Sequence, residues 1–132
     1  MSGAPELPVR KKSDDDVKFL RDALTNNRHV FNALDESELR KLTNAFEYYP
    51  ARNGETIVKK GDAGEHFYIL HTGKLAFVAD GIELGCATVP GNSFGQLALL
   101  NHAPHAATCV TVGGEARLWR IDKETFLRFV SI

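Results

Sequence analysis

The chain has 132 residues, of which 43% are hydrophobic, so its length allows one compact domain with one core and excludes two domains of ordinary size. Sixteen basic residues oppose seventeen acidic ones for a formal net charge of -1, which excludes a global electrostatic attraction to nucleic acid or to an anionic membrane. Because no apolar run approaches the roughly 20 residues of a membrane-spanning helix, and residues 1–8 lack the apolar centre of a signal peptide, we expect a soluble, cytoplasmic protein with no membrane or nucleic-acid partner.

Residues 1–13 form a first segment that is rich in small, proline and basic residues and has no hydrophobic period. We expect this segment to be a flexible arm that stands apart from the domain, residues 14–132. Within it, the run Arg10-Lys11-Lys12-Ser13 places a serine three residues after an arginine, a spacing that kinases selective for basic residues can read. A solvated basic tail explains the same run, so both interpretations stay open.

Two helices are predicted after the arm. The first, Asp14–Asn26, begins with three aspartates, which suit the positive end of the helix dipole. The second begins where Asp35 can form a capping box with Glu38, and should run to about Glu47. Apolar residues recur at helical spacing in both: Val17, Leu20 and Leu24 in the first, and Leu39, Leu42, Ala45 and Phe46 in the second.

From residue 48 onward, Gly and Pro separate short runs rich in Val, Ile, Phe, Tyr and Thr, a pattern typical of an antiparallel sandwich or barrel. Tight turns are indicated at Asn53-Gly54, Thr72-Gly73 and Asp80-Gly81, so we expect successive strands to pair as a meander. The expected strands are Tyr48–Arg52, Thr56–Lys60, His66–His71, Lys74–Ala79, Glu83–Val89, Ala107–Val112 and Ala116–Ile121.

Two later stretches break the β pattern and predict short helices. Good helix formers follow Gly95 directly, and the unpaired backbone N–H groups at such a helix start favour an anion. Pro104 turns the chain back so that residues 105–108 can face the same helix end, which indicates a phosphate pocket. A closing helix starts after the capping residue Asp122, and because the sequence stops early in this helix we expect a fragment of a longer protein.

The run Phe94–Thr108, FGQLALLNHAPHAAT, resembles the phosphate-binding cassette of cyclic nucleotide-binding domains, FGELALxxxxPRAAT, with unbroken spacing. It agrees at nine of the eleven fixed positions of that cassette. The resemblance to this family, in the type found in cAMP- and cGMP-dependent protein kinases, extends over about residues 11–132. Outside the cassette it rests on residues 54–58, 60–64, 67–70 and 73–75, which resemble early strands, and on residues 118–122, which resemble the last strand.

The resemblance implies a mainly β fold with flanking helices, in which a jelly-roll-like β-barrel (a double-stranded β-helix) lies between an N-terminal helical bundle and a C-terminal hinge helix. It implies a regulatory domain rather than an enzyme, with cAMP or cGMP as the ligand and no further cofactor. The protein partner would be a kinase catalytic domain or a sister cyclic nucleotide-binding domain. The ligand-binding residues it implies are Gly95, Gln96, Leu97, Ala98, His105, Ala106 and Ala107.

This sequence departs from the cassette at two of these positions. Gln96 replaces a glutamate that accepts a hydrogen bond from the ribose 2′-hydroxyl, and it can still accept one without charge. His105 replaces the arginine that clamps the phosphate, and near neutral pH it offers one donor instead of a charged fork. Loss of the charged clamp should cost about 2–4 kcal/mol, roughly a 30- to 1000-fold loss in affinity.

A weakened cyclic nucleotide site therefore competes with the alternative of a degenerate, non-binding domain that serves as an interaction module. Where binding persists, we expect a preference for cAMP, because Ala106 offers no hydroxyl to the guanine amino group.

A cupin-type metal enzyme is a further alternative, because His102 and His105 are three residues apart and His66 and His71 could neighbour each other on strands. No acidic ligand has cupin-like spacing, so we expect no metal.

Two remaining features argue against other functions. Bacterial transcription factors share the implied fold, but they need a helix-turn-helix after the hinge helix, and this sequence ends before one, so we set DNA binding aside. The two cysteines, Cys86 and Cys109, lack metal or disulfide-framework spacing, and we expect both to be reduced and buried.

Overall fold

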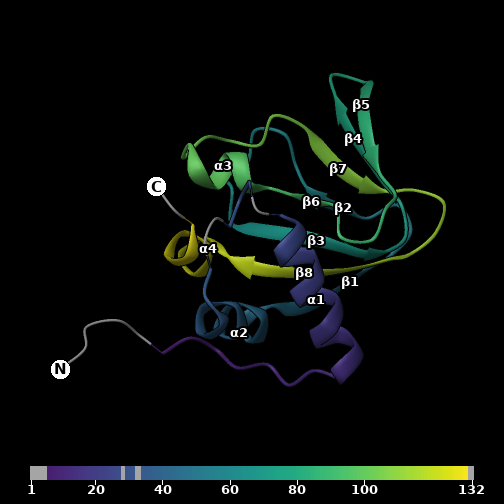
Figure 1. The fold of residues 1–132 in the computed structure, drawn as a ribbon. Helices are drawn as coiled ribbons and strands as arrows, with labels where there is room; N and C mark the ends of the chain where they lie inside the picture. Colours follow the sequence, from purple (N-terminus) through teal and green to yellow (C-terminus); the bar gives the residue numbers. More distant parts are fainter. Residues whose placement is uncertain (1–5, 28, 32–33, 131–132) are drawn as a thin grey trace.

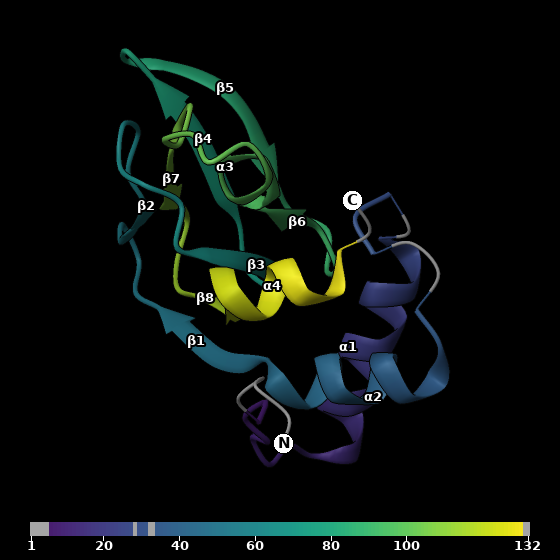
Figure 2. The ribbon, with the colours of Figure 1, turned by 90° about the vertical axis from the view of Figure 1, so that its left-hand side faces the viewer.

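The computed structural model describes residues 6–27, 29–31 and 34–130 and shows two β-sheets with helices gathered on one side (Figure 1). The helices are α1 (Asp14–Asn26), α2 (Glu36–Ala45), α3 (Gln96–Leu100) and α4 (Lys123–Phe129). The strands are β1 (Glu47–Ala51), β2 (Thr56–Val58), β3 (His66–Thr72), β4 (Leu75–Ala79), β5 (Ile82–Ala87), β6 (Ser93–Phe94), β7 (Thr108–Thr111) and β8 (Ala116–Asp122). Figure 2 shows α1 and α2 at the end of the molecule opposite the β4–β5 hairpin.

In the described part of the chain, each sheet has four antiparallel strands, in the orders β1-β8-β3-β6 and β2-β7-β4-β5. The predicted meander is wrong, because only β4 and β5 are both consecutive in the chain and paired with each other. Their turn uses Asp80 and Gly81, which have positive φ values of 52° and 78°. The turns at Gly54 and Gly73 instead carry the chain from one sheet to the other. The predicted mainly β, jelly-roll-like fold is confirmed, with two sheets in place of a closed barrel.

Local capping explains where the helices begin. At the start of α1, the Ser13 hydroxyl accepts a hydrogen bond of 3.1 Å from the backbone N–H of Asp16. Asp35 and Glu38 form the predicted capping box of α2, and the Asp122 carboxylate caps α4. The predictions for these helices are confirmed, and α2 ends slightly earlier than expected. Strand β6 was missed because its two residues carry no repeating pattern.

The N-terminal segment differs from the flexible arm that we expected. Leu7 packs against the helical core, and the backbone N–H of Arg10 donates to the carbonyl of Asn44 over 2.9 Å. The Arg10 guanidinium donates to the carbonyl of Ala45, and the Lys12 ammonium donates to that of Asn44 over 3.0 Å. Helix α2 has no basic residue in its last turn, so these two side chains supply the positive charge that its C-terminus favours. Leu7, Arg10 and Lys12 therefore contact the helical part of the fold, and residues 1–5 lie outside the described residues.

Two apolar clusters hold the elements together. One joins the helices to the outer face of the β3–β8 sheet, where the Phe67 and Phe126 rings stack at 5.1 Å and Phe31 meets both edge-on. The other fills the space between the sheets around Leu70 and Leu118. No helix in the described residues is long and apolar enough to cross a membrane.

The two cysteines lie in different surroundings. Cys109 is buried as predicted, and burial raises the pKa of its thiol to about 12. The prediction that Cys86 is buried is wrong, because Cys86 lies in β5, which forms the exposed edge of its sheet.

Candidate ligand-binding site

The segment Phe94–Thr108, here called the cassette segment, leaves β6 through a glycine that no other residue could replace without strain. Gly95 has a φ of +97°, a region that L side chains rarely adopt. A Cβ atom added to it would lie 2.7 Å from the carbonyl oxygen of His66. A Cβ atom added to Gly64 would lie equally close, at 2.7 Å, to the Cβ of Ala98. Glycines at these two positions therefore let α3 pack directly against the chain at the start of β3.

The returning part of the cassette segment is fixed by backbone hydrogen bonds to the β2–β3 loop. The N–H of His105 donates to the carbonyl of Asp62, and the N–H of Gly61 donates to the carbonyl of His105, both over 2.9 Å. Pro104 forms an antiparallel bridge with Ala63 between them. The position of residue 105 is thus set by its backbone rather than by its side chain.

A cavity of about 410 Å³, the cassette hollow, brings together all seven residues implied by the resemblance. Three residues of its lining lie outside the cassette segment and were not predicted: Val58, Phe77 and Ser93. The alternation of Leu75, Phe77 and Ala79 in β4 is a signal that could have identified Phe77 as inward-facing. The full lining consists of Val58, Phe77, Ser93, Phe94, Gly95, Gln96, Leu97, Ala98, Asn101, Ala103, Pro104, His105, Ala106 and Ala107.

None of these described lining residues is a lysine, arginine, aspartate or glutamate, so only His105 could bring a charge to the cassette hollow. Burial lowers the pKa of His105 below its usual value, and the nearby carboxylates of Asp62 and Glu65 raise it by less. His105 is therefore mostly neutral near pH 7, and the hollow offers an anion only hydrogen-bond donors.

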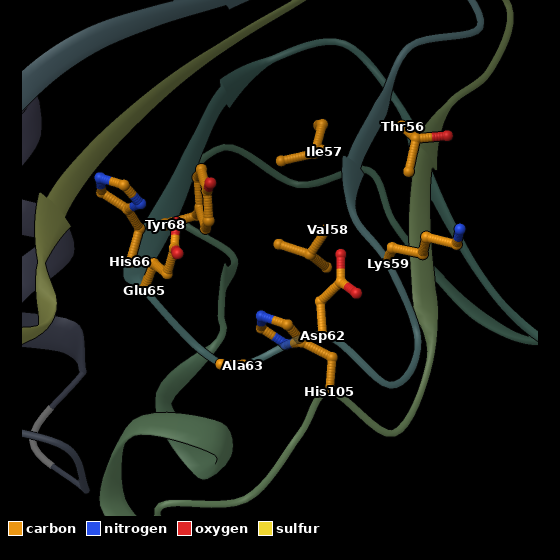
Figure 3. A pocket seen from close by; sticks show the side chains of 10 residues that line it. All are labelled: Thr56, Ile57, Val58, Lys59, Asp62, Ala63, Glu65, His66, Tyr68 and His105. Atoms are coloured by element: carbon orange, nitrogen blue, oxygen red, sulfur yellow. The ribbon is translucent and has the colours of Figure 1, made fainter.

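His105 and Val58 also line a second cavity, of about 430 Å³, which we call the carboxylate hollow (Figure 3). Figure 3 shows the side chains of Asp62 and His105 next to each other at its edge. Burial lowers the pKa of His66, which lies across the hollow. The full lining is Thr56, Ile57, Val58, Lys59, Asp62, Ala63, Glu65, His66, Tyr68 and His105. The two hollows meet at His105, so a cation there would face two carboxylates on one side and the cassette hollow on the other.

Gln96 has an unsatisfied acceptor. Its Oε1 atom is buried and has no hydrogen-bond partner among the described residues. Burying an acceptor without a donor costs about 1–3 kcal/mol, and a turn of the Gln96 side chain toward a ligand hydroxyl would recover that energy. Position 96 is the one at which the resemblance implies a contact to a ribose hydroxyl.

Of the four histidines considered for a cupin-like metal site, His66 and His105 line the carboxylate hollow, and His71 and His102 lie outside it. His71 stacks on Phe19 at 3.9 Å and accepts a hydrogen bond from the Trp119 indole over 3.0 Å. His102 is exposed in the loop after α3, where its φ is 50°. In the part of the chain that the structure describes, no three His, Cys, Asp or Glu residues are grouped so that they could hold a metal ion.

Comparison with known proteins identifies relatives of the whole domain. The sequence model described as the cyclic nucleotide-binding domain matches residues 50–132. A cGMP-dependent protein kinase of Eimeria tenella is 28% identical over 120 residues, which are 91% of this chain and 12% of the kinase. A cAMP-dependent protein kinase regulatory subunit of Yarrowia lipolytica is 34% identical over 118 residues, 89% of this chain and 31% of the subunit.

Solved structures agree with these sequence matches. A mutant regulatory subunit of a cAMP-independent protein kinase A from Trypanosoma brucei, bound to cAMP in its A site, superposes with a TM-score of 0.87 at 27% identity. The match covers 96% of this chain and 46% of that one. This chain thus spans less than half of the length of each of these relatives.

Proposed function

The chain belongs to the cyclic nucleotide-binding domain family, and on that premise we propose that it is a regulatory domain that binds a cyclic nucleotide weakly. The observation that carries the proposal is the cassette hollow, in which one cavity collects all seven expected contact positions. Gly95, with its positive φ, and the close packing of Ala98 on Gly64 place the backbone at the start of α3 in the lining of the hollow, where its N–H groups could donate to a ligand.

We infer weak binding of the cyclic nucleotide from the charges that line the cassette hollow. A cyclic phosphate carries a negative charge, and the cassette hollow offers it no lysine or arginine and a histidine that burial keeps mostly neutral. Hydrogen bonds to charged groups contribute about 1.5–3 kcal/mol each, so the loss of a bidentate cation would weaken a nanomolar site greatly, and we expect a dissociation constant of about tens of micromolar or more. The unpaired Gln96 oxygen supports retention of a ribose contact.

The setting we propose is that of the relatives: the domain would regulate a cAMP- or cGMP-dependent protein kinase in the cytoplasm. Its protein partner would be the catalytic domain or a sister cyclic nucleotide-binding domain. The domain itself would have no catalytic activity.

Titration calorimetry with cAMP, cGMP, adenosine and guanosine tests the ligand site. We expect cAMP to bind at about tens of micromolar and adenosine to bind within roughly tenfold of it, because the phosphate has little to hold it. A submicromolar dissociation constant for either cyclic nucleotide would show that His105 does not weaken the site.

The described lining of the cassette hollow contains no lysine or arginine, which also favours a second function. In this alternative the domain binds no nucleotide and acts by packing against a kinase partner. Thermal unfolding separates the two, because a ligand that binds only the folded state raises the melting temperature. No shift with any of the four compounds at millimolar concentration would favour the packing role.

A further inference from the structure

The run Arg10-Lys11-Lys12-Ser13 takes no part in the cassette hollow and lies beside a cavity of its own. This cavity, the arm hollow, has a volume of about 750 Å³ and lies between the N-terminal segment and strands β1 and β8. Trp119 of β8 is part of its apolar lining. Its charged lining consists of the four cations Arg10, Lys11, Lys12 and Arg117 and the single carboxylate of Asp16, and Ser13 lies among them.

Two of these cations, Lys12 and Arg10, lie close enough to affect each other. The Lys12 ammonium donates to two carbonyl oxygens and lies 5.7 Å from the centre of the Trp119 ring. Burial, followed by the charge of Arg10, lowers the pKa of Lys12 to about 8. Arg10 shares Glu47 with Arg120 at distances of 3.7 and 2.8 Å. An anion in the arm hollow would therefore relieve repulsion that the fold leaves in place.

Ser13 is positioned to supply that anion. It is exposed, its backbone is extended with φ of -68° and ψ of 160°, and residues 6–13 form no helix or strand. A modifying enzyme would have to displace only the hydrogen bonds of Arg10 and Lys12 to the end of α2. Arg10 stands three residues before it, with two lysines between. Its hydroxyl caps α1 by accepting a hydrogen bond from Asp16, and a phosphate oxygen could accept the same bond.

We propose that Ser13 is a phosphorylation site for a kinase that reads basic residues, and that the arm hollow receives the phosphate. The Ser13 oxygen attacks the γ-phosphorus of a nucleoside triphosphate held by that external kinase. The new O–P bond forms as the bond from the γ-phosphorus to the β–γ bridging oxygen breaks. The nucleoside diphosphate leaves, and the hydroxyl proton passes to a base of the kinase.

Two sets of charges then act on the phosphate in opposite directions. The cations of the arm hollow favour its dianion and lower its second pKa, whereas the carboxylates of Asp14, Asp15 and Asp16 raise it. In an unfolded peptide the same aspartates and the cations next to Ser13 are present, but Arg117 of β8 is absent. The difference between the folded chain and the peptide therefore combines the effect of the hollow with that of the positive end of the α1 dipole, and a substitution of Arg117 isolates the part that comes from the hollow.

The first experiment tests the modification. We would incubate the whole chain, its Ser13→Ala variant and a peptide of residues 6–18 with a kinase selective for basic residues and map the phosphate by mass spectrometry. We expect Ser13 to be modified in the chain and in the peptide, and no incorporation at this position in the variant. Modification of the peptide alone, or of neither, would overturn the proposal.

The second experiment tests the hollow, using phosphoserine placed at position 13 during translation and phosphorus NMR. Phosphoserine has a second pKa of about 6, and we expect a value lower by about half a unit or more in the folded chain than in the phosphorylated peptide. Arg117→Gln should reverse part of that difference, and Lys41→Gln, an exposed charge of α2 outside the hollow, should leave it unchanged. A value in the folded chain equal to or above that of the peptide would show that the hollow does not hold the phosphate.

Discussion

An anion site requires a suitable backbone geometry and a positive charge, and the cassette hollow and the arm hollow each provide one of these. The cassette hollow has the backbone geometry, with Gly95 at a positive φ and close to the start of β3, but no lysine or arginine in its described lining. The arm hollow has four cations but is built on an irregular segment that was expected to be flexible. The comparison teaches that backbone geometry and charge are separate features of an anion site, and that a fold can retain the first after losing the second.

The largest change should come from restoring the charge to the cassette hollow. In the variant with His105→Arg and Gln96→Glu, a guanidinium at the junction of the two hollows would pair with Asp62 or Glu65 and with the phosphate. We expect calorimetry to show cAMP affinity higher by roughly 30- to 1000-fold, about 2–4 kcal/mol.

His102→Arg is the matched control for this experiment, because it adds the same charge to the same loop outside the lining of the cassette hollow. It should change affinity little. Equal affinity in the double variant and the parent protein would mean that the cavity does not admit the cyclic phosphate.

The second prediction concerns a substitution that disturbs the backbone at Gly95 and changes no charge. Gly95→Ala would force a Cβ to within 2.7 Å of the His66 carbonyl at a positive φ, which should lower the free energy of unfolding by about 1–3 kcal/mol. Urea denaturation measures this loss. Gly85→Ala, in an open position of β5, should stay within about 0.5 kcal/mol of the parent protein. Equal losses in the two variants would contradict the close packing at Gly95.

The third prediction is that acidification protonates His105 and so adds a positive charge to the cassette hollow. A bound cyclic phosphate raises the pKa of His105, so affinity should rise as pH falls from 7.5 to 5.5, by at most about tenfold. Calorimetry at the two pH values measures the gain. It should vanish in His105→Ala, and a gain of the same size in that variant would place the titrating group elsewhere.

Without ligand, the same acidification should act in the opposite direction on stability. Burial lowers the pKa values of His66, His71 and His105 in the folded chain, so below pH about 6.5 the unfolded chain binds more protons. The melting temperature of the free protein should therefore fall as pH decreases from 7.5 to 5.5. A rise over this range would indicate that these side chains gain negative partners on folding.

The smallest effect should come from the arm hollow. Lys12→Met keeps an apolar stem over Trp119, removes the donor to the Asn44 carbonyl at the end of α2, and also removes a charge that burial and Arg10 disfavour. Because these two effects oppose each other, the free energy of unfolding should stay within about 0.5 kcal/mol of that of the parent protein. Ligand affinity should not change. Lys18→Met removes an exposed ion pair with Asp22 and should cost about 0.3–0.5 kcal/mol. A change in cAMP affinity in Lys12→Met would show that the two hollows are coupled.

Features set by neighbouring residues could be predicted from the sequence. The capping box of Asp35 and Glu38, the bounds of α1 and the spacing of the cassette segment all depend on residues a few positions apart. Strand partners could not be predicted in this way, because hairpin-type turns such as the one at Gly73 also serve to change sheets. The packing of Arg10 and Lys12 on α2 depends on carbonyl groups more than thirty residues away. For the same reason the sequence alone identified the seven residues of the cassette segment but not Val58 or Phe77, which other strands bring to the hollow.

The backbone pairing of residue 105 with Gly61 and Asp62 has a consequence for how this protein can evolve. Because these hydrogen bonds involve no side-chain atom, a mutation at position 105 can alter ligand preference without displacing the loop. Histidine and arginine codons can differ by a single base, and so can those of glutamine and glutamate. The lineage could therefore lose or regain a charged clamp in few mutational steps, with each intermediate still able to fold.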